Sequence, residues 1–190
     1  MTRIEIMNIL PLKIEGAFRI VLDAHRDDRG FFFRSYDQDA LKKQGLVTEW
    51  IQESHSFSAK KGTVRGLHFQ VPPHAETKIV RAGQGSIFMV LLDLRAASTT
   101  FGSWDSVVLS IENPELLYTP KGIAMGMCTL TDNCSLLYKM DMPYEPKSAR
   151  TVHWNDPALA IPWPVTDPIL SDKDKTAPLL KEFLALQGAL

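Results

Sequence analysis

The stretch GTVRGLHFQVPPHAETKIVRAGQG, residues 62–85, contains two short β-rich runs separated by turn residues. The first run, VRGLHFQ, ends at two prolines, and the second, TKIVRA, ends at the glycines of GQG. Proline removes a backbone donor and glycine permits turn conformations, so both residues mark strand ends. The runs also carry Arg65, His68 and Lys78, and ionisable groups rarely lie in buried strands without a partner or a purpose. The stretch therefore predicts two strands with a functional site on them.

The rest of the chain repeats this pattern. Further β-rich runs, each ending at turn residues, are TEWIQESHSF, SIFMVLLDL, WDSVVLSI, LLYT, IAMGMCTL and CSLLYKMD. They predict an all-β fold, an antiparallel sandwich or closed barrel without βαβ alternation. We expect only short peripheral helices, one at residues 37–45 and one at the C-terminal end, residues 172–187, where leucines and Phe183 form a helical apolar stripe. Residues 155–170 are rich in proline and predict an extended segment laid over the barrel.

Length and composition limit the class of protein. The chain has 190 residues, 45% hydrophobic and 23% charged, with a net charge of −1. We therefore expect one globular domain over residues 1–190 and no nucleic-acid partner, since that would need a broad cationic face. The longest apolar runs are too short to span a membrane, and the N-terminal residues lack the apolar core of a signal peptide. Two cysteines form no disulfide framework, which favours a cytoplasmic protein.

Half of a metal-binding pattern is present. Cupins, which are small double-stranded β barrels, bind a metal through a His-x-His motif with a later Glu and through Pro-x-Gly-x-x-His. Here the first motif would be His68, Gln70 and Glu76, and the second would run from Pro120 to Met125. Glutamine and methionine replace two imidazoles, and a thioether is a poor ligand for hard metals. The pattern predicts a cupin-like fold without a metal site, which leaves the ionisable residues to act by proton transfer.

Seven motifs in order carry a family resemblance: DDRGFFFRSY, VRGLHFQ, KIVRAGQGSIFMVLLDLR, LYTPKGIAMG, LLYKMD, HWNDPALAIPWP and LSDKDKTAPLL. Together they resemble the dTDP-4-dehydrorhamnose 3,5-epimerase family, over roughly residues 10–182. The resemblance implies a cupin-type jelly roll, a homodimer with exchanged N-terminal strands, and no cofactor. It implies an epimerase that removes protons from C3, C5 or both, beside the C4 ketone of a nucleotide-linked 4-keto-6-deoxy sugar, for deoxysugar or polysaccharide biosynthesis.

The resemblance also implies four catalytic residues. His68 matches the family's base, and Asp174 matches the carboxylate that fixes its tautomer. Lys78 matches the cation near the C4 oxygen, where it would stabilise the enolate. Tyr138 matches the acid that returns a proton from the other face of the ring.

The remaining implied residues bind substrate. Arg65 matches a phosphate-binding arginine, and Arg29 is expected to bind phosphate from the partner chain, because a guanidinium suits a pyrophosphate. The further expected substrate-binding residues are Phe32, Arg34, Gln52, Ser54, His55, Met125 and Tyr144.

Structural readings stand beside these roles. Lys78 could be an outward-facing strand residue and Tyr138 a barrel aromatic. Asp174 lies three residues after Ser171, which is the spacing of a helix cap. Arg65 and His68 are three residues apart, so a regular strand would point them to opposite faces unless a bulge at Gly66 intervenes.

The chain departs from the family pattern around the nucleotide. Met125 replaces a histidine, Ser54 an asparagine and Arg34 an acidic residue, while Pro143 and Ala149 stand where Tyr and Glu are usual. These changes predict an altered nucleotide or sugar. Arg34 could read the acceptor edge of guanine, or could instead lie on the surface and pair with Asp37 or Asp39.

Two other classes of protein remain open from the sequence. The first is a non-catalytic sugar-nucleotide-binding member of the fold, although His68, Tyr138 and Asp174 are all present. The second is a metal-dependent cupin that would use His68, His74 and Glu76.

Overall fold

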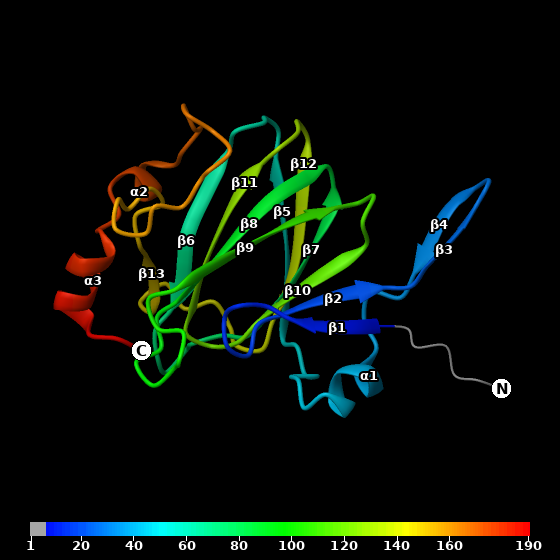
Figure 1. The fold of residues 1–190 in the computed structure, drawn as a ribbon, viewed down its shortest axis with the longest axis horizontal. Helices are drawn as coiled ribbons and strands as arrows, with labels where there is room; N and C mark the ends of the chain where they lie inside the picture. Colours follow the sequence, from blue (N-terminus) through cyan, green and yellow to red (C-terminus); the bar gives the residue numbers. More distant parts are fainter. Residues whose placement is uncertain (1–6) are drawn as a thin grey trace.

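Two facing antiparallel sheets build the molecule (Figure 1). The computed structural model describes residues 7–190, and residues 1–6 lie outside it. The six-stranded sheet has the order β1 (Met7–Pro11), β2 (Phe18–Leu22), β10 (Glu115–Thr119), β7 (Lys78–Gln84), β12 (Cys134–Met140) and β5 (Gln52–Ser58). The five-stranded sheet has the order β13 (Ala149–Thr151), β6 (Val64–Gln70), β11 (Ile123–Thr129), β8 (Ser86–Asp93) and β9 (Trp104–Ser110). The predicted all-β jelly roll of the cupin type is confirmed.

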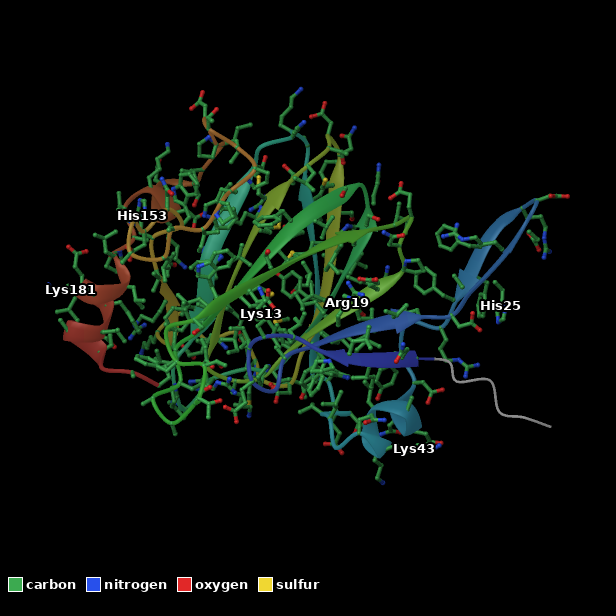
Figure 2. The ribbon with its side chains drawn as sticks, viewed as in Figure 1. Lys13, Arg19, His25, Lys43, His153 and Lys181 are labelled. Atoms are coloured by element: carbon green, nitrogen blue, oxygen red, sulfur yellow. The ribbon has the colours of Figure 1, made fainter. Side chains whose placement is uncertain are left out.

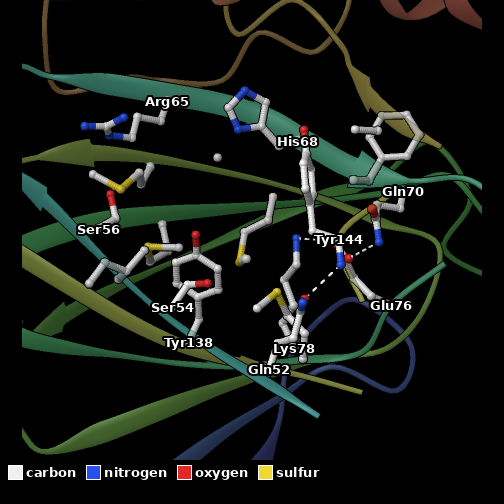
Figure 3. A pocket seen from close by; sticks show the side chains of 18 of the residues that line it. Gln52, Ser54, Ser56, Arg65, His68, Gln70, Glu76, Lys78, Tyr138 and Tyr144 are labelled. Atoms are coloured by element: carbon white, nitrogen blue, oxygen red, sulfur yellow. Dashed lines mark hydrogen bonds and ion pairs between the residues drawn. The ribbon is translucent and has the colours of Figure 1, made fainter. Parts of the chain in front are cut away.

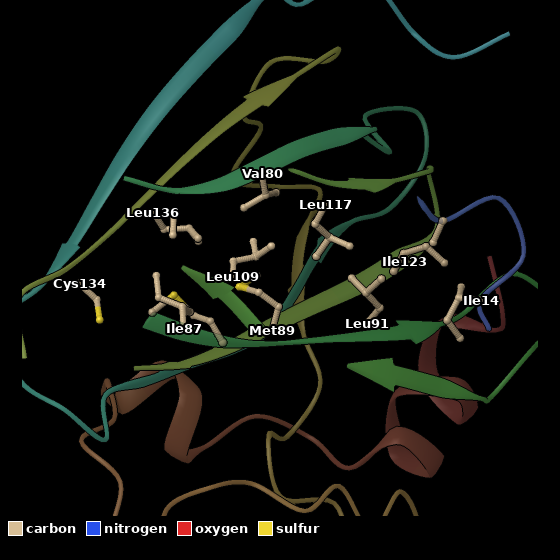
Figure 4. Close-up of a cluster of buried hydrophobic side chains, with 13 residues drawn as sticks. Ile14, Val80, Ile87, Met89, Leu91, Leu109, Leu117, Ile123, Cys134 and Leu136 are labelled. Atoms are coloured by element: carbon tan, nitrogen blue, oxygen red, sulfur yellow. The ribbon is translucent and has the colours of Figure 1, made fainter. Parts of the chain in front are cut away.

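The main core lies between the two sheets (Figure 4). Val80, Leu117 and Leu136 reach it from the six-stranded sheet, and Met89 and Leu109 from the five-stranded sheet. Because side chains alternate along a strand, β8 sends Ile87, Met89 and Leu91 inward while Val90 and Leu92 point outward. The outward residues are also buried, because the C-terminal part of the chain covers the outer face of the five-stranded sheet.

That cover is formed by the proline-rich segment and the last helix. Trp163 packs edge-on against Phe88 of β8 and Trp154, and Phe183 packs edge-on against Phe69 of β6. Between residues 155 and 170 the only ladder contact is an isolated bridge from Ile169 to Thr63. The segment covers the sheet as predicted, but it is not extended throughout, because residues 157–159 form a turn and Ala160 has φ +48°.

The helices differ from the prediction at the C-terminal end. α1 (Gln38–Lys43) begins at Asp37, whose side chain accepts a hydrogen bond from Ala40 N, as predicted for residues 37–45. The prediction of a single C-terminal helix was wrong, because the structure has two, α2 (Asp172–Lys175) and α3 (Leu180–Gln187). Pro178 lies between them and disfavours helical conformation in the residue before it, and its carbonyl accepts from His153 N at 2.8 Å. Within residues 7–190, no helix is long and apolar enough to cross a membrane.

The N-terminal strands form two separate units. β1 and β2 pair with each other, and β2 continues the six-stranded sheet by pairing with β10 of the same chain. β3 (Ala24–Asp27) and β4 (Gly30–Phe33) form a two-stranded hairpin that projects away from the jelly roll (Figure 1). His25, labelled in Figure 2, lies on this projecting hairpin.

Candidate active site

A cavity of about 600 Å³ opens between the two sheets (Figure 3). It is lined by side chains from both of them and by residues of α2 and of the loop before β13. The cavity brings together eight residues predicted from the sequence: Gln52, Ser54, Arg65, His68, Lys78, Met125, Tyr138 and Tyr144.

Strand alternation explains most of the lining. On β5, Gln52, Ser54 and Ser56 are two residues apart and face the cavity together. On β12, Tyr138 shares its face with Leu136, which lies in the core. Lys78 shares its face with Val80 in the same way, so this lysine points inward, and the outward-facing reading of Lys78 does not hold.

A β-bulge brings Arg65 and His68 to the same cavity. His68 pairs with Met125 of β11, whereas Arg65 pairs with Met127, so three steps on β6 face two steps on β11. The extra residue lies at Gly66–Leu67, where the side chain of Leu67 turns to the outer face of the sheet and packs with Val90 and Leu92 under the C-terminal part of the chain. Gly66 has φ +122°, and a Cβ there would lie 2.6 Å from Gly126 Cα. The predicted bulge is present, and it requires glycine.

His68 and Asp174 form a close polar pair at the cavity wall. His68 Nε2 lies 2.6 Å from Asp174 Oδ1, although the two residues are 106 positions apart in the sequence. The His68 side chain is 39% exposed and the Asp174 side chain 3% exposed, so the imidazole can reach a ligand while the carboxylate is shielded. A buried carboxylate bound to one ring nitrogen fixes the tautomer of the imidazole. The other ring nitrogen, Nδ1, then remains available to a ligand.

Asp174 also takes part in the helix cap of α2, at the spacing from Ser171 that the alternative reading proposed. Ser171 is the N-cap of α2, and its hydroxyl accepts from Asp174 N at 3.2 Å and donates to Asp174 Oδ2 at 2.8 Å. Burial by itself would raise the pKa of Asp174, but hydrogen bonds from His68, Ser171 and Gly66 N, with the charge of His68, lower it overall. The carboxylate therefore stays ionised beside the imidazole, and it contacts both His68 and the N-cap residue Ser171.

Lys78 lies at another part of the cavity wall, in a buried ion pair. Its Nζ is 2.6 Å from Glu76 Oε1, and the two side chains are 13% and 6% exposed. Glu76 Oε2 accepts a hydrogen bond from Gln70 Nε2 (Figure 3). Two of the three residues expected in the half-present metal motif thus bind each other and an ammonium group.

Tyr138 brings a hydroxyl to the cavity from the sheet opposite His68. Its side chain lines the cavity together with Met89 and Met127, and its hydroxyl makes no hydrogen bond to any residue between 7 and 190. A free hydroxyl among thioethers is available to a ligand, because nothing in the described chain competes for it.

Four predicted site residues lie elsewhere in this chain. Arg29, at the tip of the β3–β4 hairpin, pairs with Asp27 at 2.6 Å, and Phe32 on the same hairpin is 66% exposed. Arg34 pairs with Asp37 at 3.1 Å, as its surface reading proposed. His55 hydrogen-bonds to Ser135 and points away from the cavity, because it alternates with Ser54 and Ser56.

Comparison with known proteins gives the family. The model of the dTDP-4-dehydrorhamnose 3,5-epimerase family matches residues 11–182. The chain belongs to this family. The dTDP-4-dehydrorhamnose 3,5-epimerase of Escherichia coli is 39% identical over 183 residues, covering 95% of this chain and 98% of that relative. The predicted family and enzyme class, an epimerase of nucleotide sugars, are confirmed.

Solved structures of epimerases superpose on most of the chain. The dTDP-4-dehydrorhamnose 3,5-epimerase of Bacillus anthracis, with TDP and PPi bound, gives a TM-score of 0.89 at 44% identity and covers 92% of this chain and 99% of its own. A 3′-monoepimerase of Streptomyces bikiniensis, in complex with dTDP-quinovose, gives a TM-score of 0.89 at 30% identity and covers 95% and 91%.

Sequence reasoning missed several residues of this epimerase's cavity. Met89, Met127 and Met140 line it with Met125, and their strand parity, inward from β8, β11 and β12, was the available signal. Arg150 and Lys173 add cations, and Ala149, one of the departures from the family pattern, lies beside them. No sequence pattern singled out these two cations.

The metal-dependent alternative lacks a suitable cluster. Within residues 7–190, no three side chains among His, Cys, Asp and Glu come together as metal ligands. His74 hydrogen-bonds to Ser148 at 3.0 Å, and Glu76 is neutralised by Lys78. The donors proposed with His68 are thus engaged elsewhere.

Proposed function

We propose that this chain inverts C3, C5 or both in a dTDP-linked 4-keto-6-deoxy hexose, without a cofactor, for deoxysugar biosynthesis. His68 removes the proton beside the C4 ketone, and Lys78 stabilises the negative charge that develops on the C4 oxygen. Tyr138 donates a proton to the same carbon from the opposite side. Exchange with water then restores the starting protonation of both residues.

One observation carries the proposal. A histidine paired to a buried carboxylate and a tyrosine with a free hydroxyl reach one cavity from opposite sheets, His68 from β6 and Tyr138 from β12. Inversion at carbon needs removal and return of the proton on opposite faces of the ring, so a base and an acid on facing sheets suit it. A non-catalytic binding protein has no need of this pair.

The guanidinium of Arg65 and the hydroxyls near it suit the diphosphate. Arg65 is held by Ser58 Oγ and Phe57 O, both at 3.3 Å, and it lines the cavity together with the hydroxyls of Ser54 and Ser56. A guanidinium and two hydroxyls are good donors for phosphate oxygens. We assign the diphosphate to this end of the cavity and the keto sugar to the space between His68, Tyr138 and Lys78.

The proposed nucleotide is dTDP. The relatives that bind TDP or a dTDP sugar support it. The guanine reading of Arg34 loses its support within this chain, because that side chain pairs with Asp37. Calorimetric titration with dTDP, UDP, CDP and GDP tests the choice: dTDP should bind at least tenfold tighter than the others, a difference of about 1.4 kcal/mol. Binding of GDP as tight as that of dTDP, or tighter, would instead support guanine as the nucleobase.

The proposed assembly is a homodimer in which the β3–β4 hairpin reaches the partner's cavity. Phe32 is 66% exposed and the Arg29 side chain 90% exposed, so this chain buries neither of them. An exposed aromatic and a cation on a projecting hairpin suit a nucleobase and a phosphate. The predicted cytoplasmic location stays a prediction.

Solvent deuterium uptake tests the activity. The purified chain is incubated in D₂O with dTDP-4-keto-6-deoxyglucose, and label at C3 and C5 is followed by NMR. Label at C3, C5 or both, with inverted product, is the expected result, and the labelled carbons identify the inverted centres. Tight dTDP binding without label would favour the non-catalytic class, and exchange that a chelator abolishes would favour the metal cupin.

A further inference from the structure

The buried ion pair of Lys78 gives a role to a residue that the mechanism has not used. Glu76 contacts the Lys78 ammonium at 2.6 Å, and both side chains line the cavity. At 6% exposed, Glu76 has little solvent to stabilise its charge, and its second oxygen accepts a hydrogen bond from Gln70 Nε2. Burying a carboxylate is costly unless it is paired and hydrogen-bonded, and Glu76 is both.

Gln70 anchors this carboxylate to the protein backbone. Gln70 is 3% exposed, and its Nε2 also lies within hydrogen-bonding distance of His74 O at 2.9 Å and Pro143 O at 3.1 Å, so its two hydrogens are shared among three acceptors. Its Oε1 accepts from Glu145 N at 2.6 Å. The amide thus has one defined orientation, with its NH₂ group toward Glu76. Lys78 is held by Glu76, Glu76 by Gln70, and Gln70 by backbone atoms.

We propose that Glu76 is a positioning residue for the reaction: it holds the Lys78 ammonium aimed into the cavity, with Gln70 fixing the carboxylate. A flexible lysine side chain without a counter-ion turns toward solvent, and the ion pair with Glu76 prevents this. An electrophile for an enolate must be charged and in place before the proton leaves, because preorganised charge is what lowers the barrier. This inference rests on the proposed function of Lys78.

The half-present metal motif supports the same assignment. Gln70 and Glu76 stand at two of the positions that a metal-binding cupin uses for ligands. Here Glu76 binds an ammonium group and Gln70 binds Glu76. The Lys78 ammonium therefore supplies, at this end of the cavity, the positive charge that a metal ion would supply at those positions.

Three variants and a control test the proposal. Glu76→Gln keeps the size of the side chain and removes its charge, Lys78→Met removes the ammonium, and a third variant carries both changes. Glu115→Gln is the matched control, because Glu115 pairs with Arg19 at 3.5 Å on β10 and β2, and neither residue lines the cavity. Each protein is assayed for kcat, KM, deuterium uptake and thermal unfolding.

We expect Glu76→Gln to lower kcat by about 10- to 100-fold with KM changed less than about threefold. Deuterium uptake should fall as much as kcat, because the lost step is enolate formation. In the Lys78→Met background, Glu76→Gln should lower kcat less than about twofold further, since Glu76 acts through the lysine. Glu115→Gln should match the wild type.

Two results would overturn the inference while the proposed function stands. One is a wild-type kcat in Glu76→Gln, or a loss no larger than its unfolded fraction accounts for. The other is a full 10-fold or greater loss added to that of Lys78→Met, which would mean that Glu76 acts independently. A wild-type chain that takes up no deuterium overturns the proposed function and this inference together.

Discussion

His68 Nε2 and Asp174 Oδ1 lie 2.6 Å apart, and the carboxylate that holds the imidazole also forms part of a helix cap. Asp174 Oδ2 accepts from the Ser171 hydroxyl at 2.8 Å, so each carboxylate oxygen has its own partner. α2 therefore fixes the carboxylate before any substrate binds. A base oriented by a fixed carboxylate needs little rearrangement when it takes a proton.

Asp174→Asn should reduce turnover more than it reduces stability. The amide keeps the size of the side chain but loses the charge that orients and stabilises a protonated His68, so we expect kcat to fall by at least about 10-fold. Ser171→Ala removes the cap hydroxyl and should cost about 1 kcal/mol of unfolding free energy with a smaller loss of kcat. Urea unfolding and kcat are measured on both variants. If both lose stability and kcat in the same proportion, capping is the only role of Asp174.

Tyr138→Phe should separate the two halves of the reaction. Removing the hydroxyl leaves His68, Asp174 and Lys78 in place, so proton abstraction continues while the return of a proton from the opposite face is lost. We expect deuterium to enter at the original face with little inverted product, which NMR of the recovered sugar measures. Loss of exchange and inversion to the same extent would remove Tyr138 from the role of a dedicated acid.

Gly66→Ala should unfold or strongly destabilise the protein. The new Cβ would lie 2.6 Å from Gly126 Cα and 2.8 Å from Met125 O, both backbone atoms that cannot move aside independently. Gly30→Ala is the matched control, because Gly30 has φ +130° and nothing within 4 Å of its Cβ position. We expect a loss of roughly 3 kcal/mol or more at Gly66, and about 1–2 kcal/mol at Gly30 from the backbone conformation alone. Equal losses in urea unfolding would mean that close packing at the bulge contributes nothing.

Local patterns predicted strands β5 to β12 well, because most of these runs end near Gly, Pro, Asn or Asp, but they predicted none of the strands β1 to β4. The C-terminal helix failed for a physical reason: its apolar stripe was read across Pro178, which ends the helical path. Leu186, one of the residues in that stripe, is 77% exposed. The short strand β13 has three residues, too few for a pattern to be seen.

Family motifs located the candidate site better than spacing did. His68 and Asp174 are 106 positions apart, and no local rule joins them. The pairing of Glu76 with Lys78 depends on where β7 begins, and the burial of that pair depends on both sheets. Arg29 and Phe32 show where the family motifs fail to locate the site. Their motif is clear, but the fold of a single chain does not bring these two side chains to its own cavity.

Acid should destabilise the protein through Asp93 at the end of β8. Burial by itself raises the pKa of Asp93, but hydrogen bonds from Arg95, Ser98 and Thr100 outweigh it and lower the pKa to about 2. The unfolded carboxyl titrates near its ordinary 3.8, so the unfolded state binds more protons as pH falls from about 4 to 2. The stabilisation is thus complete above this window, worth roughly 2–3 kcal/mol, and is lost within it. Urea unfolding from pH 7 to 2 should show this loss. Asp93→Asn should have a lower free energy of unfolding at pH 7 and a smaller decrease of it between about pH 4 and 2. A decrease as large as in the wild type would assign the loss to other carboxylates.

Mixed dimers should show whether the β3–β4 hairpin serves the partner's cavity. His68→Asn removes the base, so its homodimer should be slower by about 10²–10⁴-fold. A second variant, Arg29→Ala with Phe32→Ala, keeps His68 but loses the two exposed hairpin side chains, and its homodimer should bind dTDP weakly. In a heterodimer of the two, exchange across the two-fold axis gives one cavity an intact His68 and an intact hairpin, and leaves the other with neither. We therefore expect co-expressed, differently tagged chains, purified through both tags, to recover roughly half of the wild-type kcat per dimer. If each hairpin served its own cavity, both cavities of the heterodimer would be defective and no activity would return. A heterodimer of His68→Asn with unchanged chain is the control, and it should also give half of the wild-type rate.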